Sequence, residues 1–126
     1  MKKILICTLA IIILVVVLKV ANVKRIILRK MYVKDYSEYV YEYATEYNVD
    51  PLLVFAVIKA ESNFKKDATS TSNAIGLMQL MENTAIETGE KVNEKINSKE
   101  ELYNPKINVK IGIKYLSELL ERYDGK

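Results

Sequence analysis

The segment that organises this chain reads Pro51-Leu52-Leu53-Val54-Phe55-Ala56-Val57-Ile58-Lys59-Ala60-Glu61-Ser62. Asp50 before it is a good N-cap and Pro51 suits the first position of a helix, so a helix is predicted to begin there. Residues 52–58 are apolar on every face, which predicts a helix that is buried all round. Glu61 and Ser62 then stand at the C-terminal end of that helix.

Glu61 is the candidate catalytic residue in this segment. A carboxyl group at the rim of an apolar helix is costly to ionise, and the negative end of the helix dipole opposes ionisation as well. Both effects favour the protonated form, which is what a general acid needs near neutral pH. The alternative interpretation is a helix-end glutamate in water.

The segments on either side are predicted to be helical too, and no strand pattern is evident. A helix is expected over residues 36–47, where Asp35 and Glu38 fit a capping pattern and tyrosines recur at helical spacing. That tyrosine stripe is interpreted as core, with a sugar-stacking surface as the alternative. Residues 63–73 form a polar loop, and residues 77–81 are too apolar for an exposed loop, so they are expected to fold back under a cleft.

Two short helices are predicted next. One runs to about Thr88, with Gly89 as its stop. Ser98 and Glu101 have the spacing of a capping pair and begin the other.

The last predicted helix starts with Asn104 as its cap and Pro105 at its first position. Gly112 inside it costs stability relative to alanine, so it indicates close helix packing. The expected buried stripe comprises Ile107, Ile111, Tyr115, Leu119 and Tyr123.

Three motifs follow one another along the chain. They are Glu61-Ser62-Asn63-Phe64, then Gly76-Leu77-Met78-Gln79-Leu80-Met81 with Thr84-Ala85, and then Asn104-Pro105-Lys106-Ile107-Asn108-Val109 with Gly112 and Tyr115-Leu116. Together they resemble the catalytic domain of the soluble lytic transglycosylase family, from about residue 49 to residue 123. The resemblance implies an all-α, lysozyme-like domain that cleaves the glycan strands of peptidoglycan.

The resemblance also assigns roles by position. It implies Glu61 as the catalytic acid and base, with substrate-binding residues at Ser62, Ser70, Met78, Gln79 and Met81 and with no metal and no cofactor. Ser62 is placed to hydrogen-bond the acid, and the methionines have core packing as their alternative. The family usually has proline after its second methionine, where this chain has Glu82, and a glutamate also suits the first turn of a helix.

The implied reaction needs one carboxylic acid. Glu61 protonates the oxygen between N-acetylmuramic acid and N-acetylglucosamine, the substrate's acetamido group stabilises the positive charge, and the C6 hydroxyl then attacks C1 to leave a 1,6-anhydro end. Ordinary glycosidases use two carboxylates, and Asp67 and Glu82, the other candidates, look like solvated charges. Two alternatives stay open: a goose-type lysozyme-like hydrolase, and a non-catalytic peptidoglycan-binding or scaffold protein.

Composition excludes several other classes. The chain of 126 residues has no histidine, which removes serine–histidine and cysteine–histidine catalysis and the usual zinc sites. Its one cysteine, Cys7, lies in an apolar run and is interpreted as a small apolar residue. The net charge of +3 is uneven, because residues 1–31 hold seven Lys or Arg and no acid while residues 32–126 have a net charge of −4. No basic patch with interleaved aromatics indicates a nucleic-acid partner.

The N-terminal segment predicts two parts in the chain, a signal anchor with its basic flank at 1–31 and the transglycosylase-type domain at 32–126. The apolar run from Ile4 to Leu18 is interpreted as an uncleaved, single-pass transmembrane helix in contact with membrane lipid, with a cleaved signal peptide as the alternative. The basic residues after it favour a cytoplasmic domain. The substrate lies outside the cell, so we expect the domain on the extracytoplasmic side of the cell membrane.

The predicted domain has only about 95 residues, near the size at which one core is marginal. The family normally continues into a helical segment with an Ala-Tyr-Asn-Ala-Gly motif, which is absent from this sequence. The domain is therefore expected to be C-terminally incomplete. A truncated chain, a missing wall supplied by a partner from the cell-wall machinery, and a degenerate protein are the three interpretations.

Overall fold

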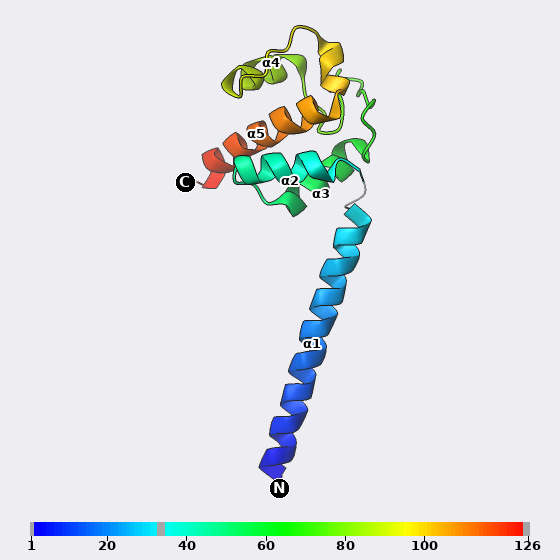
Figure 1. Cartoon of the computed structure of the whole chain (residues 1–126), viewed down its shortest axis with the longest axis vertical. Helices are drawn as coiled ribbons and strands as arrows, with labels where there is room; N and C mark the ends of the chain where they lie inside the picture. Colours follow the sequence, from blue (N-terminus) through cyan, green and yellow to red (C-terminus); the bar gives the residue numbers. More distant parts are fainter. Residues whose placement is uncertain (1, 33–34, 125–126) are drawn as a thin grey trace. The chain divides into compact units, whose positions relative to one another are not determined.

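The computed structural model describes the backbone of residues 2–32 and 35–124 and the side chains of residues 11–26 and 35–123. Its elements are the helices α1 Lys2–Tyr32, α2 Ser37–Glu46, α3 Pro51–Ser62, α4 Glu82–Lys91 and α5 Pro105–Asp124, with the 3-10 helix η1 Lys99–Tyr103 (Figure 1). The only bridges in these ranges are isolated ones, from Ile75 to Thr69 and to Leu80. The expected all-α class is confirmed.

The chain divides into two units, 1–34 and 35–126. The first contains α1, whose described side chains, residues 11–26, are all exposed. Within the described part of the chain, no helix combines the length and the apolar character that crossing a membrane requires. Part of the predicted span from Ile4 to Leu18, and Cys7 with it, lies outside the described side chains.

In the second unit, α5 is the central element. It packs against α2 on one side and against α4 and η1 on the other (Figure 1). Burial on both sides explains why its buried positions do not form the single stripe expected from the sequence. Ile111 is fully buried as predicted, but Tyr115 is 37% exposed and Tyr123 is 64% exposed. Five other positions of α5 are buried: Asn108, Val109, Gly112, Ile113 and Ser117.

The helix α2 carries the tyrosine stripe. On the face that bears this stripe, Val40, Tyr43 and Ala44 are buried, whereas Tyr36, Tyr39 and Tyr47 are half-buried, so the interpretation as core is confirmed for part of the stripe. The predicted cap is wrong: the N-cap residue is Tyr36, which has a left-handed backbone (φ 65°) and makes no side-chain capping bond.

The helix α3 begins as predicted, because the Asp50 carboxylate accepts a hydrogen bond of 2.9 Å from the Leu52 amide. The expectation that it is buried all round is wrong. It packs against α2, and one face of it is buried, with Val54, Phe55, Ile58 and Ser62. Leu52 and Leu53 point away from that contact and are 49% and 37% exposed.

Three predicted boundaries around α4 and α5 have different outcomes. Gly89 does not stop α4, which continues to Lys91; a Cβ at Gly89 would lie 2.4 Å from the Glu94 carbonyl oxygen, so this glycine permits a close backbone approach. Ser98 is the N-cap of η1 but makes no side-chain capping bond. The cap at Asn104 is confirmed, because its Oδ1 accepts from the backbone amides of residues 106 and 107 at 3.0 and 3.3 Å.

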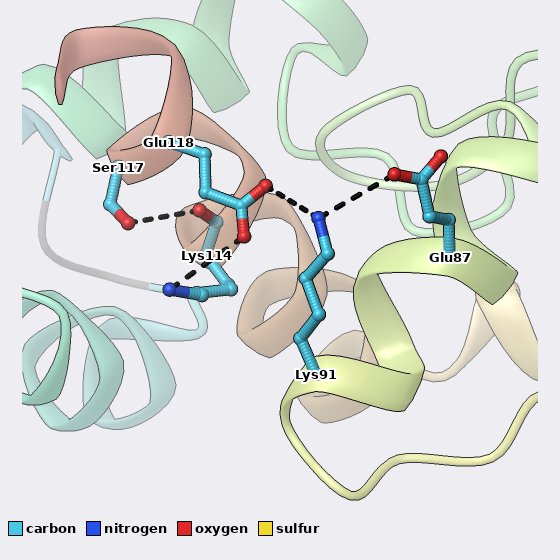
Figure 2. Close-up of polar contacts among 5 residues, drawn as sticks. All are labelled: Glu87, Lys91, Lys114, Ser117 and Glu118. Atoms are coloured by element: carbon cyan, nitrogen blue, oxygen red, sulfur yellow. Dashed lines mark hydrogen bonds and ion pairs between the residues drawn. The ribbon is translucent and has the colours of Figure 1, made fainter. Parts of the chain in front are cut away.

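Charged side chains hold α4 against α5. Figure 2 shows Lys91 between Glu87 and Glu118, with nitrogen–oxygen distances of 3.5 and 2.9 Å, and Lys114 3.7 Å from the same Glu118 carboxylate. The Ser117 hydroxyl donates to the Lys114 carbonyl oxygen, within α5 itself. Of these pairs, Lys91–Glu118 joins the two helices, whereas Glu87–Lys91 lies within α4 and Lys114–Glu118 within α5. The side chains reach solvent, so the pairs stabilise the fold little.

Candidate active site

The unit 35–126 contains a cleft of about 370 Å³ between the end of α3, the loop before α4, and α5. Glu61 lines it from α3, and Tyr115 lines it from α5. Among the described residues that line this cleft, Glu61 is the one carboxylate. The remaining lining residues are Val57, Met78, Gln79, Leu80, Met81, Thr84, Gly112, Leu116 and Leu119.

Glu61 itself is exposed. The burial expected for this carboxyl group is therefore wrong: Glu61 stands in the last turn of α3, where its side chain lines the largely apolar cleft but stays open to solvent. Glu61 makes no ion pair within the described residues. The helix ends one residue later, where Asn63 adopts a left-handed backbone (φ 50°) as the C-cap.

Ser62, the next residue, faces inward and is only 7% exposed. Its hydroxyl donates a hydrogen bond of 2.8 Å to the Leu77 carbonyl oxygen, and the Ile58 carbonyl oxygen lies 3.2 Å away. Ser62 does not line the cleft. Its hydroxyl thus ties the end of α3 to the segment that carries Met78 and Gln79.

The segment before α4 lines one side of the cleft with residues 78–81. Leu77, Met78 and Leu80 are buried, as expected for a segment folded back under a cleft, whereas Met81 is 45% exposed. A Cβ at Gly112 would lie 2.4 Å from the Met78 sulfur. The close approach predicted at Gly112 is therefore found, but its partner is the Met78 side chain in the segment before α4 and not a neighbouring helix.

Gln79 and Ser70 shape the backbone around the cleft. Gln79 has a left-handed backbone (φ 51°), and its Nε2 donates to the carbonyl oxygens of Gly76 and Ala68 at 3.0 and 3.2 Å. The Ser70 hydroxyl accepts from the amides of residues 72 and 74 at 3.2 and 3.0 Å. Ser70 does not line the cleft, so the structure gathers Glu61, Met78, Gln79 and Met81 there but not the two serines.

The other candidate carboxylates lie elsewhere. Asp67 is exposed and lines neither described pocket. Glu82 is exposed and lines a neighbouring pocket of about 290 Å³, together with Lys99 and Tyr103. Met81 lines both this pocket and the cleft of Glu61. The interpretation of Asp67 and Glu82 as solvated charges agrees with their exposure.

Seven lining residues have no site role predicted from the sequence: Val57, Leu80, Thr84, Gly112, Tyr115, Leu116 and Leu119. Thr84, Tyr115 and Leu116 belong to the quoted motifs, so a signal for them existed. Tyr115 and Leu119 were placed in a buried stripe because a single helix periodicity does not say which face borders a cleft.

Comparison with known proteins gives one family. The family model described as the transglycosylase SLT domain matches residues 38–126. The membrane-bound lytic murein transglycosylase E of Buchnera aphidicola is 33% identical over 92 residues, which are 71% of this chain and 42% of that protein. The membrane-bound lytic murein transglycosylase C of Yersinia pestis is 36% identical over 84 residues, 65% of this chain and 24% of that protein. The chain thus spans less than half the length of these relatives.

Solved structures give the same fold. An inactive mutant of the lytic transglycosylase Slt from Pseudomonas aeruginosa matches 78% of this chain with a TM-score of 0.71 and 31% identity, over 16% of that chain. The 70-kDa soluble lytic transglycosylase of Escherichia coli matches 76% of this chain with a TM-score of 0.69 and 25% identity, also over 16% of that chain. The expected lysozyme-like helical fold of the second unit is confirmed.

Proposed function

Because the chain belongs to the transglycosylase SLT domain family, we propose that it cleaves the glycan strands of peptidoglycan as a lytic transglycosylase. The bond is the β-1,4 link from N-acetylmuramic acid to N-acetylglucosamine, and the product ends in 1,6-anhydro-N-acetylmuramic acid. The observation that carries this proposal is the single carboxylate, Glu61, among the described residues of an otherwise apolar and amide-bearing cleft.

A single acid is enough when the substrate supplies the nucleophile. Glu61 donates its proton to the glycosidic oxygen as the bond to C1 breaks, and the acetamido group of the muramic acid stabilises the positive charge at C1. The resulting carboxylate then takes the proton of the C6 hydroxyl, whose oxygen bonds to C1. No water is consumed, and the nearness of the internal hydroxyl replaces a second carboxylate.

The other cleft residues have roles that fit a sugar. Gln79 offers its Oε1 as an acceptor, because its Nε2 already donates to the Gly76 and Ala68 carbonyl oxygens, and Met78 and Met81 offer apolar surface for a sugar ring. We propose that Ser62 and Ser70 do not contact the sugar directly but fix the backbone that carries these groups. The hydrolytic alternative needs a second carboxylate near the bond, and the placement of Asp67 and Glu82 outside the cleft argues against it.

The test is Glu61→Gln, which keeps the shape of the side chain but cannot donate the proton. We expect the full chain to release muropeptides from purified peptidoglycan and the variant to release none, with an unchanged helical circular-dichroism spectrum. Asp67→Asn and Glu82→Gln are the matched controls and should retain the parent's rate. Release by Glu61→Gln at the parent's rate would overturn the assignment. An inactive parent that still binds peptidoglycan would favour the non-catalytic alternative.

We also propose that segment 1–31 attaches the protein to the cell membrane, with the domain 32–126 on the extracytoplasmic side. Two observations support membrane association: the names of the relatives, which are membrane-bound transglycosylases, and the exposed apolar side chains at residues 11–18 of α1. The location of peptidoglycan outside the cytoplasm supports the orientation.

A further inference from the structure

Asn108 is a buried amide in α5 that the proposed chemistry does not use. It is 1% exposed. Its Nδ2 donates to the carbonyl oxygens of Ile75 and Leu102 at 2.9 and 2.8 Å, and its Oδ1 accepts from the Met78 amide at 2.8 Å. Both amide hydrogens and the oxygen are thus engaged, and every partner is a backbone group, which holds the backbone in place whatever its side chains are.

Two of these partners belong to the turn beside the cleft: Ile75 precedes the turn and Met78 lies within it. Ile75 and Leu80 are joined by two backbone hydrogen bonds of 2.9 and 3.0 Å, so residues 76–79 form a tight turn between them. Asn108, on α5, hydrogen-bonds to this turn, and Ser62, on α3, also hydrogen-bonds to it through the Leu77 carbonyl oxygen at 2.8 Å. Ser62 directly follows Glu61, so the hydrogen bonds of Asn108 and Ser62 together set where the turn lies relative to the carboxyl group of Glu61.

The packing around Asn108 leaves it little freedom. A Cβ at Gly76 would lie 2.3 Å from the Asn108 Nδ2 and 2.6 Å from the Leu102 carbonyl oxygen, and Gly76 has a φ of +79°. A glycine is therefore required at that position both for space and for backbone conformation. The amide of Asn108 occupies the room that a side chain at residue 76 would take.

We propose that Asn108 is a positioning residue. It fixes the turn bearing Met78 and Gln79 in the position from which these two side chains line the cleft together with Glu61. The proposal rests on the function proposed above. Asn108 does not line the cleft, so it acts on the reaction only through this turn. A small displacement of a sugar-binding wall relative to the acid lowers the rate steeply, by about a hundredfold per ångström.

The test uses Asn108→Ala and Asn108→Asp in the full chain, with Ser117→Ala as the matched control. Ser117 is a buried polar residue of the same helix, but its hydroxyl bonds only its own helix, at Lys114. At temperatures where all variants are folded, we expect Asn108→Ala to lose about tenfold to a hundredfold in kcat with a smaller change in KM. Ser117→Ala should keep the parent's kcat.

Asn108→Asp gives a signature that a general loss of stability would not give. An aspartate keeps the acceptor for the Met78 amide, but when ionised it faces two carbonyl oxygens without a donor. Once protonated it can donate to one of them, and burial makes the protonated form the favoured one. The variant should therefore recover activity relative to the parent as the pH falls, whereas Asn108→Ala should not.

Amide hydrogen exchange separates this proposal from the proposed function. The amides of residues 77–80 should exchange faster in Asn108→Ala, while the amides of α2 keep the parent's protection. Unchanged exchange in the turn, or an unchanged kcat, would overturn the positioning role. A parent that releases no muropeptides would overturn the proposed function and with it the catalytic part of this role, and the exchange data would still decide whether Asn108 fixes the turn.

Discussion

Tyr47 follows the last residue of α2 and carries a hydroxyl group with an unusual environment. The oxygen is buried and makes no hydrogen bond of good geometry within the described residues, although the Glu46 side chain lies near it. The ring stacks on Tyr43, with 6.3 Å between the ring centroids, and the Lys114 ammonium lies 5.8 Å from its centroid. Burial, and then the negative charge of Glu46, raise the pKa of Tyr47 to about 12. The ring therefore contributes packing, while the hydroxyl group contributes little.

The first prediction follows from that contrast. Tyr47→Phe removes a buried oxygen that makes no hydrogen bond of good geometry, so it should leave the free energy of unfolding unchanged or raise it by about 1 kcal/mol. Tyr103→Phe is the control, because its hydroxyl is 2.6 Å from the Thr69 hydroxyl and its loss should cost about 1 kcal/mol. Urea unfolding of the variants measures both. A larger loss in Tyr47→Phe than in Tyr103→Phe would contradict this view of the Tyr47 hydroxyl.

The second prediction concerns alkaline pH. The pKa of Tyr47 is about 12 in the folded protein, against an ordinary value of 10.0. Between these values the folded state keeps a proton that the unfolded state has lost, so stability is fully present below pH 10 and falls as the pH rises toward 12. Because lysines also titrate there, the measurement is the difference in unfolding free energy between parent and Tyr47→Phe. That difference should shift in favour of the variant across the window, and a constant difference would refute the shift.

For the site residues, some positions could be predicted from the sequence and others could not. The position of Glu61 at a helix end was predictable, because Asp50 and Pro51 fix where α3 begins and its length follows from the apolar run. The hydrogen bond from the Ser62 hydroxyl to the Leu77 carbonyl oxygen was not predictable, because Leu77 lies 15 residues further along the chain. The exposure of Glu61 was also mispredicted, since an apolar run does not show how far other elements cover the last turn of its helix.

At the scale of elements, Gly112 shows how α5 and the segment before α4 depend on each other. A Cβ at this position would lie 2.4 Å from the sulfur and 2.9 Å from the Cβ of Met78. The sequence predicted close packing from the cost of glycine in a helix, but not the partner. Caps were predictable where the capping side chain reaches the next turn, as at Asp50 and Asn104. The end of α4 was mispredicted because Gly89 serves the approach of the Glu94 carbonyl oxygen.

The third prediction tests this contact. Gly112→Ala gains about 1 kcal/mol of helix propensity but forces the added methyl group against Met78, which costs about 1–3 kcal/mol. We expect a net loss of stability and a lower rate of muropeptide release. The double variant Gly112→Ala/Met78→Ala makes room for the methyl group, so its loss should be smaller than the sum of the two single losses. Additive losses would show that the two positions do not press on each other.

At the scale of the whole molecule, the helical class and the order of the elements in the unit 35–126 were predictable, because helix periodicity is strong from residue 36 onward. The arrangement of that unit was reached through the resemblance of three motifs, not through periodicity. Periodicity alone could not show that α5 is covered on two sides, since that depends on contacts between distant segments.

The fourth prediction concerns the first unit. If segment 1–31 attaches the protein to the cell membrane, the full chain should sediment with membranes and be released by detergent but not by high salt, while residues 32–126 expressed alone should stay in the supernatant. Release of the full chain by salt alone would reduce the attachment to surface electrostatics. A reporter fused after Lys126 that is active only after export should be active, and activity of a cytoplasm-only reporter would contradict the proposed orientation.

The central claim is that Glu61 acts alone, with the substrate's own C6 hydroxyl as nucleophile. The most direct measurement is mass spectrometry of the muropeptides that the full chain releases from peptidoglycan in water enriched in heavy oxygen. We expect the new ends to be 1,6-anhydro-N-acetylmuramic acid, one water lighter than a hydrolysis product and free of the label, and we expect Glu61→Gln to yield none of them. Reducing ends that carry the heavy oxygen would show hydrolysis and contradict the account.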